Sequence, residues 1–100
     1  MSWQVYMILC SDDSLYTGIS TDALRRLEQH ARRLGARYFR SRRPRGLVYL
    51  ETGHSRSSAS RREAAIKRLK RIDKKKLVDS RRNELGGRQA ETLLEGRRAW

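Results

Sequence analysis

Short apolar runs separated by polar breaks open the chain, a pattern that predicts strands. Residues 3–9 (WQVYMIL) are rich in aromatic and branched side chains, and residues 15–19 (LYTGI) follow the polar turn at residues 11–14. Two such runs joined by a short polar connection predict an antiparallel hairpin. Tyr6 and Tyr16 fall on its facing strands, so we expect them to be neighbours across the pair.

Further along the chain, the spacing of apolar residues changes to that of amphipathic helices. One helix is expected over about residues 22–34, with the apolar stripe Leu24, Leu27, Ala31 and Leu34. A second is expected over about residues 57–72, with the stripe Ala65, Ile66, Leu69 and Ile72.

A third strand is predicted at residues 46–51 between these helices, and a short third helix at residues 74–78. The pattern predicts an α+β fold: a small three-stranded, mainly antiparallel sheet flanked by helices in the order β-β-α-β-α-α. After residue 79 the composition shifts to paired glycines and charges of both signs. We therefore expect one domain over residues 1–79 and a tail over 80–100 that is loosely helical or disordered.

The net charge of the chain indicates a class of function in addition to the fold. The chain carries 24 Lys and Arg against 11 Asp and Glu, a formal net charge of +13. Because neutralised phosphates release counterions, such a chain favours a nucleic acid partner. The alternative is that the charge is only a solvated surface.

Other compositional features exclude several classes. No apolar run approaches the roughly 18 residues that a membrane span needs. The N-terminal stretch lacks the basic region of a signal peptide. Cys10 is the only cysteine, which excludes a disulfide framework or a cysteine-based zinc site within one chain and fits the cytoplasm.

The residues with candidate catalytic roles lie on the second strand and on the first two predicted helices. Arg26 and His30 stand one helical turn apart, where a phosphate-binding guanidinium and a proton-transferring imidazole can act on one ligand. Gly18 on the second strand has no side chain and therefore allows the backbone there to be approached closely. Glu63 is the only acid between Glu51 and Asp73, and its alternative interpretation is an ordinary helical ion pair.

Basic and aromatic residues also predict a nucleic-acid-binding surface, because basic side chains follow a backbone while rings offer stacking surfaces. Packing over the core is an equal alternative for Tyr38 and the favoured one for Phe39. The candidate contacts are Arg25, Arg37, Tyr38, Arg40, Arg42, Arg43, Lys67 and Lys70.

The order of these residues resembles the GIY-YIG nuclease family. Its two name motifs stand here as Gln4-Val5-Tyr6 and Tyr16-Thr17-Gly18, followed by Arg26 and His30. The segments RRPRGLVYLE and ASRREAAIKRLKR look like the third strand and glutamate helix of small stand-alone bacterial members. Many family nucleases carry a later asparagine, for which Asn83 is a possible counterpart.

The resemblance implies a role for each candidate. Glu63 would hold one Mg²⁺ or Mn²⁺, and Arg26 would stabilise the scissile phosphate. Tyr6 would be the general base for water or would orient it. Tyr16 and His30 would complete the hydrogen-bond network, with His30 as a proton relay.

The implied function is a divalent-metal-dependent endonuclease that hydrolyses DNA phosphodiester bonds. We expect structure-selective or low-specificity cleavage in DNA repair or processing, on DNA rather than RNA. The first alternative is a non-catalytic nucleic-acid-binding module that retains the fold, and the second is a small basic RNA- or ribosome-associated protein. No protein partner is indicated.

Overall fold

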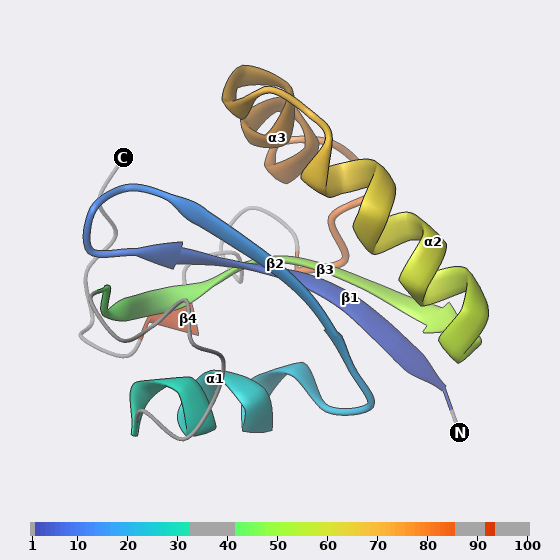
Figure 1. The fold of residues 1–100 in the computed structure, drawn as a ribbon, viewed down its shortest axis with the longest axis horizontal. Coiled ribbons are helices and arrows are strands. Elements are labelled where there is room, and N and C mark those ends of the chain that lie inside the picture. The colour runs from blue at the N-terminus through green and yellow to red at the C-terminus, as the bar shows by residue number, and fades with distance from the viewer. Residues whose placement is uncertain (1, 33–41, 86–91, 94–100) are drawn as a thin grey trace.

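A sheet with helices on both sides forms the body of the protein (Figure 1). The computed structural model describes residues 2–32, 42–85 and 92–93. The strands are β1 (Trp3–Cys10), β2 (Leu15–Ser20), β3 (Pro44–His54) and β4 (Thr92–Leu93), in the sheet order β2-β1-β3-β4. The helices are α1 (Ala23–Ala31) on one side and α2 (Arg56–Lys67) and α3 (Arg71–Val78) on the other.

These elements confirm the predicted α+β fold and the order β-β-α-β-α-α. The first three strands pair antiparallel, with β1 in the centre and β2 at one edge. The two-residue β4, which pairs with β3, was not predicted. It shows that part of the expected tail pairs with the sheet, whereas residues 86–91 and 94–100 lie outside the described residues.

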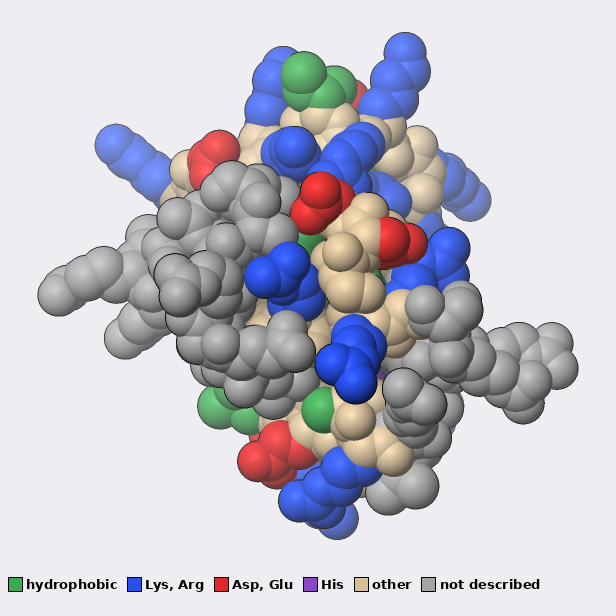
Figure 2. Space-filling view, turned by 90° about the vertical axis from the view of Figure 1, so that its left-hand side faces the viewer, with side chains coloured by type: hydrophobic (Ala, Val, Ile, Leu, Met, Phe, Trp, Pro, Cys, Tyr) green, Lys and Arg blue, Asp and Glu red, His purple; other side chains and the backbone are tan. Residues whose placement is uncertain are grey.

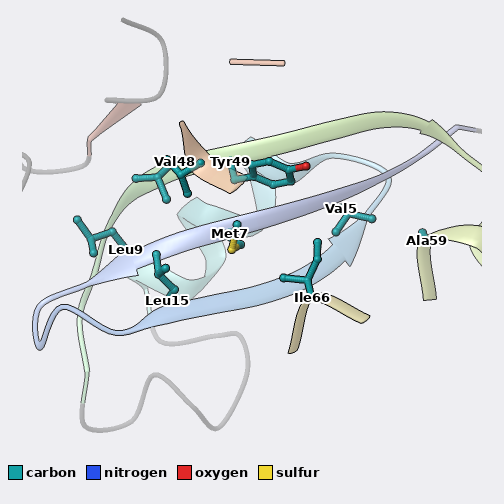
Figure 3. Close-up of a cluster of buried hydrophobic side chains, with 9 residues drawn as sticks. Val5, Met7, Leu9, Leu15, Val48, Tyr49, Ala59 and Ile66 are labelled. Carbon is teal, nitrogen blue, oxygen red and sulfur yellow. The ribbon is translucent and has the colours of Figure 1, made fainter. Parts of the chain in front are cut away.

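Strand β1 divides the core between two faces, because alternate side chains of a strand point to opposite sides. On the α2 and α3 side, Val5, Met7 and Leu9 pack with Ala59 and Ile66 (Figure 3). On the α1 side, the buried cluster is Tyr6, Ile8, Cys10, Ala23, Leu27 and Leu47. The sheet thus separates two independent sets of side chains.

The buried face of α1 is not the predicted apolar stripe. Ala23, Leu27 and His30 are buried, whereas Leu24 is 53% exposed. Ala31 is also exposed, and Leu34 lies outside the described residues. The start of the helix explains why a different face of α1 is buried from the one predicted. The Ala23 N–H donates to Gln4 Oε1 of β1 at 2.8 Å and places the small Ala23 against the sheet.

The second predicted helix is two helices. Helix α2 ends at Lys67 and α3 begins at Arg71, so the expected stripe is broken. Ile66 is buried, but Ala65, Leu69 and Ile72 are exposed. Because the chain bends after α2, Leu77 and Val78 of α3 pack against the same core as Ile66.

Residues 80–85 continue the hydrogen-bonded body beyond α3. The Glu84 N–H donates to the Leu50 carbonyl at 2.9 Å, and the Glu84 carboxylate accepts from the Thr52 N–H at 2.8 Å. This segment is therefore hydrogen-bonded to Leu50 and Thr52, in the C-terminal half of β3.

Candidate active site

Three aromatic rings from three elements meet on the α1 side of the sheet. Tyr6 of β1 is 1% exposed, and its hydroxyl lies 3.4 Å from Nε2 of His30 on α1. The ring of Tyr16 on β2 lies 6.4 Å from the Tyr6 ring and 5.4 Å from the His30 ring, between centroids. The predicted tyrosine pair is therefore in contact range, and His30 joins it.

Gly18 makes the room that Tyr6 occupies. It stands directly opposite Tyr6 in the hairpin register. A Cβ atom at this position would lie 2.6 Å from the Tyr6 hydroxyl oxygen and 2.7 Å from its Cζ. No side chain larger than hydrogen fits there without displacing the Tyr6 ring.

Arg26 brings a positive charge to the same cluster. It is half-buried on α1, one turn before His30, and its Nη1 donates to Gln29 Oε1 at 2.7 Å. Its hydrogen bond and its charge both act on the Tyr6 hydroxyl, and its charge also acts on Tyr16 and His30. The guanidinium is thus placed where an anion would meet Tyr6.

Glu63 approaches from the other helical layer. It lies on α2, and its negative charge acts on the hydroxyls of both Tyr6 and Tyr16. Because β2 is the edge strand, a carboxylate on α2 can act round that edge on side chains of the α1 face. Glu63 also pairs with Lys67 Nζ at 3.3 Å. The five predicted residues therefore come from β1, β2, α1 and α2, and the other four all act on Tyr6.

Burial changes the chemistry expected of Tyr6. It raises the pKa of Tyr6 to about 12, with Tyr16 and Glu63 adding to the rise and Arg26 opposing it. At neutral pH only roughly one tyrosine in 10⁵ is then ionised. The hydroxyl is therefore a neutral phenol that can orient a ligand, and a role as general base would need a bound cation together with Arg26 to lower this pKa.

His30 is also neutral near physiological pH. Its burial, followed by the charge of Arg26, lowers its pKa to about 4. A neutral imidazole can accept the Tyr6 hydroxyl proton in the 3.4 Å contact. Sequence spacing placed His30 beside the buried stripe, but the side chain is 0% exposed and lies within it.

A divalent cation has one suitable oxygen donor among the predicted residues, the Glu63 carboxylate. Across residues 2–32, 42–85 and 92–93, no group of three or more His, Cys, Asp or Glu side chains comes together. Mg²⁺ commonly takes one or two carboxylates and completes its shell with water and substrate phosphate. The half-buried Glu63 carboxylate fits the one protein ligand that such an ion needs.

Asn83 does not serve this site. Its amide is buried and donates to the carbonyls of Val48 and Val78, each at 2.8 Å. Its Oδ1 accepts from the N–H groups of Leu50 and Leu85 at 3.2 and 3.1 Å. All of its bonding capacity fastens the chain after α3 to β3, so the possible family counterpart is structural here.

The predicted nucleic-acid contacts are spread over several surfaces. Arg25 on α1 and Lys70 at the start of α3 are exposed, and Lys67 pairs with Glu63. Arg42 pairs with Asp12 of the hairpin turn at 2.7 Å, and the backbone of Arg43 bonds to Ser11. Arg37, Tyr38, Phe39 and Arg40 lie outside the described residues.

A second buried polar cluster, which the sequence did not predict, lies on the opposite face of the sheet. Glu51 of β3 is 8% exposed and accepts from the Tyr49 hydroxyl, from Arg62 Nε at 2.8 Å and from His54 Nε2 at 2.9 Å. His54 Nδ1 lies 2.8 Å from Ser58 Oγ on α2. His54 therefore helps to join β3 to α2.

Comparison with known proteins agrees with this geometry. The family described as the GIY-YIG catalytic domain matches residues 2–76. The chain belongs to the GIY-YIG family. Within this family it is 53% identical over 78 residues to a UPF0213 protein of Desulfotalea psychrophila, covering 77% of this chain and 71% of that protein.

The chain is also similar to other UPF0213 proteins, including one of known structure. A UPF0213 protein of Staphylococcus haemolyticus is 44% identical over 77 residues, covering 77% of this chain and 94% of that protein. The solution NMR structure of a UPF0213 protein from Bacillus halodurans superposes with a TM-score of 0.53 at 35% identity, covering 90% of this chain and 93% of the other. These GIY-YIG relatives support a nuclease family and a nucleic acid substrate. Among the described helices, none has the length and apolar content to cross a membrane.

Proposed function

We propose that this GIY-YIG protein is a divalent-metal-dependent endonuclease that hydrolyses DNA phosphodiester bonds. The observation that carries the proposal is that Tyr16, Arg26, His30 and Glu63 all act on the buried Tyr6. A binding module without catalysis has no need for a buried phenol on which both an arginine and a carboxylate act. We further propose structure-selective or low-specificity cleavage in DNA repair or processing in the cytoplasm.

In this mechanism, Arg26 binds the scissile phosphate and stabilises the charge that develops on its oxygens. Preorganised donors of this kind contribute about 10²–10³ in rate each. Neutral Tyr6 donates its hydroxyl hydrogen bond to Nε2 of neutral His30 and accepts one from the attacking water, which it holds in line. The water loses its proton to bulk solvent as the bond from phosphorus to the leaving oxygen breaks, and that oxygen takes up a proton from solvent. Tyr16 packs against both rings and limits their movement.

Glu63 would hold the Mg²⁺ or Mn²⁺, which when bound would offset phosphate charge and favour ionisation of a water molecule. With Lys67 at 3.3 Å, the carboxylate already carries a compensating positive charge. Lys67 would have to leave Glu63 for this carboxylate to hold the cation, and its ammonium group could then contact a substrate phosphate.

Cleavage assays on nicked, flapped, single-stranded and duplex DNA with Mg²⁺ or Mn²⁺ test the proposal. Glu63→Gln and Arg26→Ala should each lower cleavage by about 10²–10³. Glu28→Gln and Arg32→Ala are matched controls, since both residues are exposed on or beside α1 and belong to no part of the site. Cleavage that persists without metal, or in both site variants, would overturn the assignment.

Binding without cleavage by the wild type would instead favour the alternative of a non-catalytic nucleic-acid-binding module. In either case, affinity should fall steeply with salt. Six or so phosphate contacts would lower affinity by about 10³ between 50 and 200 mM salt. A flat salt response would argue against the basic surface as the binding surface.

A further inference from the structure

The corner between α2 and α3 exposes two large apolar side chains. Leu69 is 37% exposed and Ile72 is 62% exposed, and they lie three residues apart at the bend. Among the described residues the other exposed large apolar side chain is Leu24, on the opposite side of the sheet. An uninterrupted helix would have kept Leu69 and Ile72 in line with the buried Ile66, so the bend is what brings them to the surface.

The surroundings of this corner are strongly basic. Between residues 67 and 76 the one acid is Asp73. The basic residues there are Lys67, Arg68, Lys70, Arg71, Lys74, Lys75 and Lys76. Figure 2 shows hydrophobic atoms at the top of the molecule, where α3 lies, between lysine and arginine side chains. The corner therefore combines a small apolar tip, formed by Leu69 and Ile72, with a surrounding rim of basic side chains.

The corner also adjoins the candidate active site. Lys67, the last residue of α2, contacts Glu63 one turn before it, and Leu69 follows two residues later. Leu69 lies six residues after Glu63 along the chain, just past the end of the helix that carries this carboxylate. A DNA strand with a phosphate at Glu63 could therefore also reach this corner.

We propose that Leu69 and Ile72 form a wedge that contacts an exposed base at a discontinuity in DNA, such as a nick, gap or flap. This inference rests on the proposed function, and it names the substrate feature that the same site would select. An intact duplex offers this corner only phosphates, to which apolar atoms contribute nothing. At a break, the terminal base pair exposes an apolar face, and proteins often insert aliphatic side chains between such unstacked bases.

An anionic membrane would also present charge and apolar atoms, but the features of the corner favour DNA. Membrane-bound amphipathic helices carry a long apolar face. Here two side chains protrude beside a site that interacts with phosphate, and α3 is eight residues long. Binding to anionic vesicles is therefore treated as a result against the proposal.

Fluorescence anisotropy in EDTA tests the wedge without any cleavage. We expect the wild type to bind a one-nucleotide-gapped 30-mer about tenfold more tightly than the intact duplex, as burial of roughly 60 Å² of apolar surface would contribute. In Leu69→Ser/Ile72→Ser this preference should vanish while intact-duplex affinity stays within twofold. Leu24→Ser, a matched exposed leucine, should keep the preference.

A 2-aminopurine base at the gap gives a second readout, because its fluorescence rises when it is unstacked. The rise should occur with wild type and with Leu24→Ser but not with the double variant. A wild type without a gap preference, a double variant that keeps it, or comparable binding to phosphatidylglycerol vesicles would each overturn the wedge. Since EDTA removes catalysis, these results are independent of whether the protein cleaves DNA.

Discussion

Tyr6 and Tyr49 lie on adjacent central strands and are equally buried, but their hydroxyl groups are held very differently. The Tyr49 hydroxyl donates to the Glu51 carboxylate, which Arg62 and His54 also bind. The Tyr6 hydroxyl has a neutral imidazole at 3.4 Å, near the long limit of a hydrogen bond. The Tyr49 phenol belongs to a closed ionic network, whereas the Tyr6 phenol has this long imidazole contact and a hydrogen bond from Arg26.

The difference follows from where each cluster lies. Tyr49 faces the α2 layer, where a buried carboxylate, an imidazole and a guanidinium satisfy one another and join β3 to α2. Tyr6 faces the α1 layer near the edge strand, where a hydrogen bond and the charge of Arg26 act on its hydroxyl and Glu63 acts through its charge. A closed polar network stabilises a fold, whereas a hydroxyl beside a half-buried cation can also bind an anionic substrate.

Paired removal of the two hydroxyls tests this contrast most strongly. Tyr6→Phe should lower single-turnover cleavage by about 10²–10³ because the oriented hydroxyl is lost, and should leave the free energy of unfolding almost unchanged. Tyr49→Phe should keep cleavage but lower the free energy of unfolding by about 1–3 kcal/mol, since Glu51 loses a buried donor. Urea unfolding beside the cleavage assay measures both. If the two variants exchanged these effects, the catalytic assignment would be wrong.

Glu51→Gln removes the centre of the second cluster. Arg62 then loses its buried partner, and we expect the free energy of unfolding at pH 7 to fall by about 3 kcal/mol. Burial alone would raise the pKa of Glu51, but hydrogen bonds from Tyr49, His54 and Arg62 outweigh it and lower the pKa. The stabilisation by Glu51 is therefore complete above its unfolded pKa of about 4.3 and is lost as pH falls through the lower folded value.

Urea titrations of the wild type, Glu51→Gln and the exposed control Glu28→Gln at pH 7 and at pH 3 check this. The wild type and the control should lose part of this stabilisation at pH 3, which lies below the unfolded pKa, whereas Glu51→Gln should lack it at both values. A Glu51→Gln protein as stable as the control at pH 7 would mean that the cluster does not hold β3 to α2.

His30 should make the free energy of unfolding depend on pH over a different range from that of Glu51. Its folded pKa of about 4 lies below the unfolded value of 6.5, so the unfolded chain takes up a proton first. Stability should be full above about pH 6.5 and should fall by at most about 3 kcal/mol as pH drops to about 4. In His30→Asn this fall should be absent, while the Glu51 window remains. A wild type with no change across this range would contradict a buried neutral His30.

Much of this fold was predictable because its strands carry local signals. The polar turn and flanking branched residues predicted the hairpin, and its register then places Gly18 against Tyr6. The phase of the helices was not predictable in the same way. Ala23 and Ala59 are buried because small residues let a helix approach the sheet closely, and larger residues such as Leu24 and Ile72 remain outside.

The candidate site shows the same division. Residue types and order predicted which side chains belong together, but their protonation depends on burial that only the fold sets. The raised pKa of Tyr6 and the lowered pKa of His30 both follow from burial between β1 and α1. Asn83 could not be assigned from sequence either, because its four backbone partners come from β3, α3 and the chain that follows.

Two glycine substitutions give the finest test of the contrast between site and scaffold. Gly18→Ala places a methyl group 2.6 Å from the Tyr6 hydroxyl, so the ring must move. We expect a loss of about 1–3 kcal/mol in unfolding free energy and a roughly tenfold fall in cleavage, as misplaced catalytic groups lose rate steeply. Gly53→Ala meets no atom within 4 Å but strains a backbone with φ of +78°, and should destabilise by about 1–2 kcal/mol. Its cleavage rate, measured well below the melting temperature, should equal that of the wild type. Equal cleavage by the two variants would show that the position of Tyr6 does not limit the reaction.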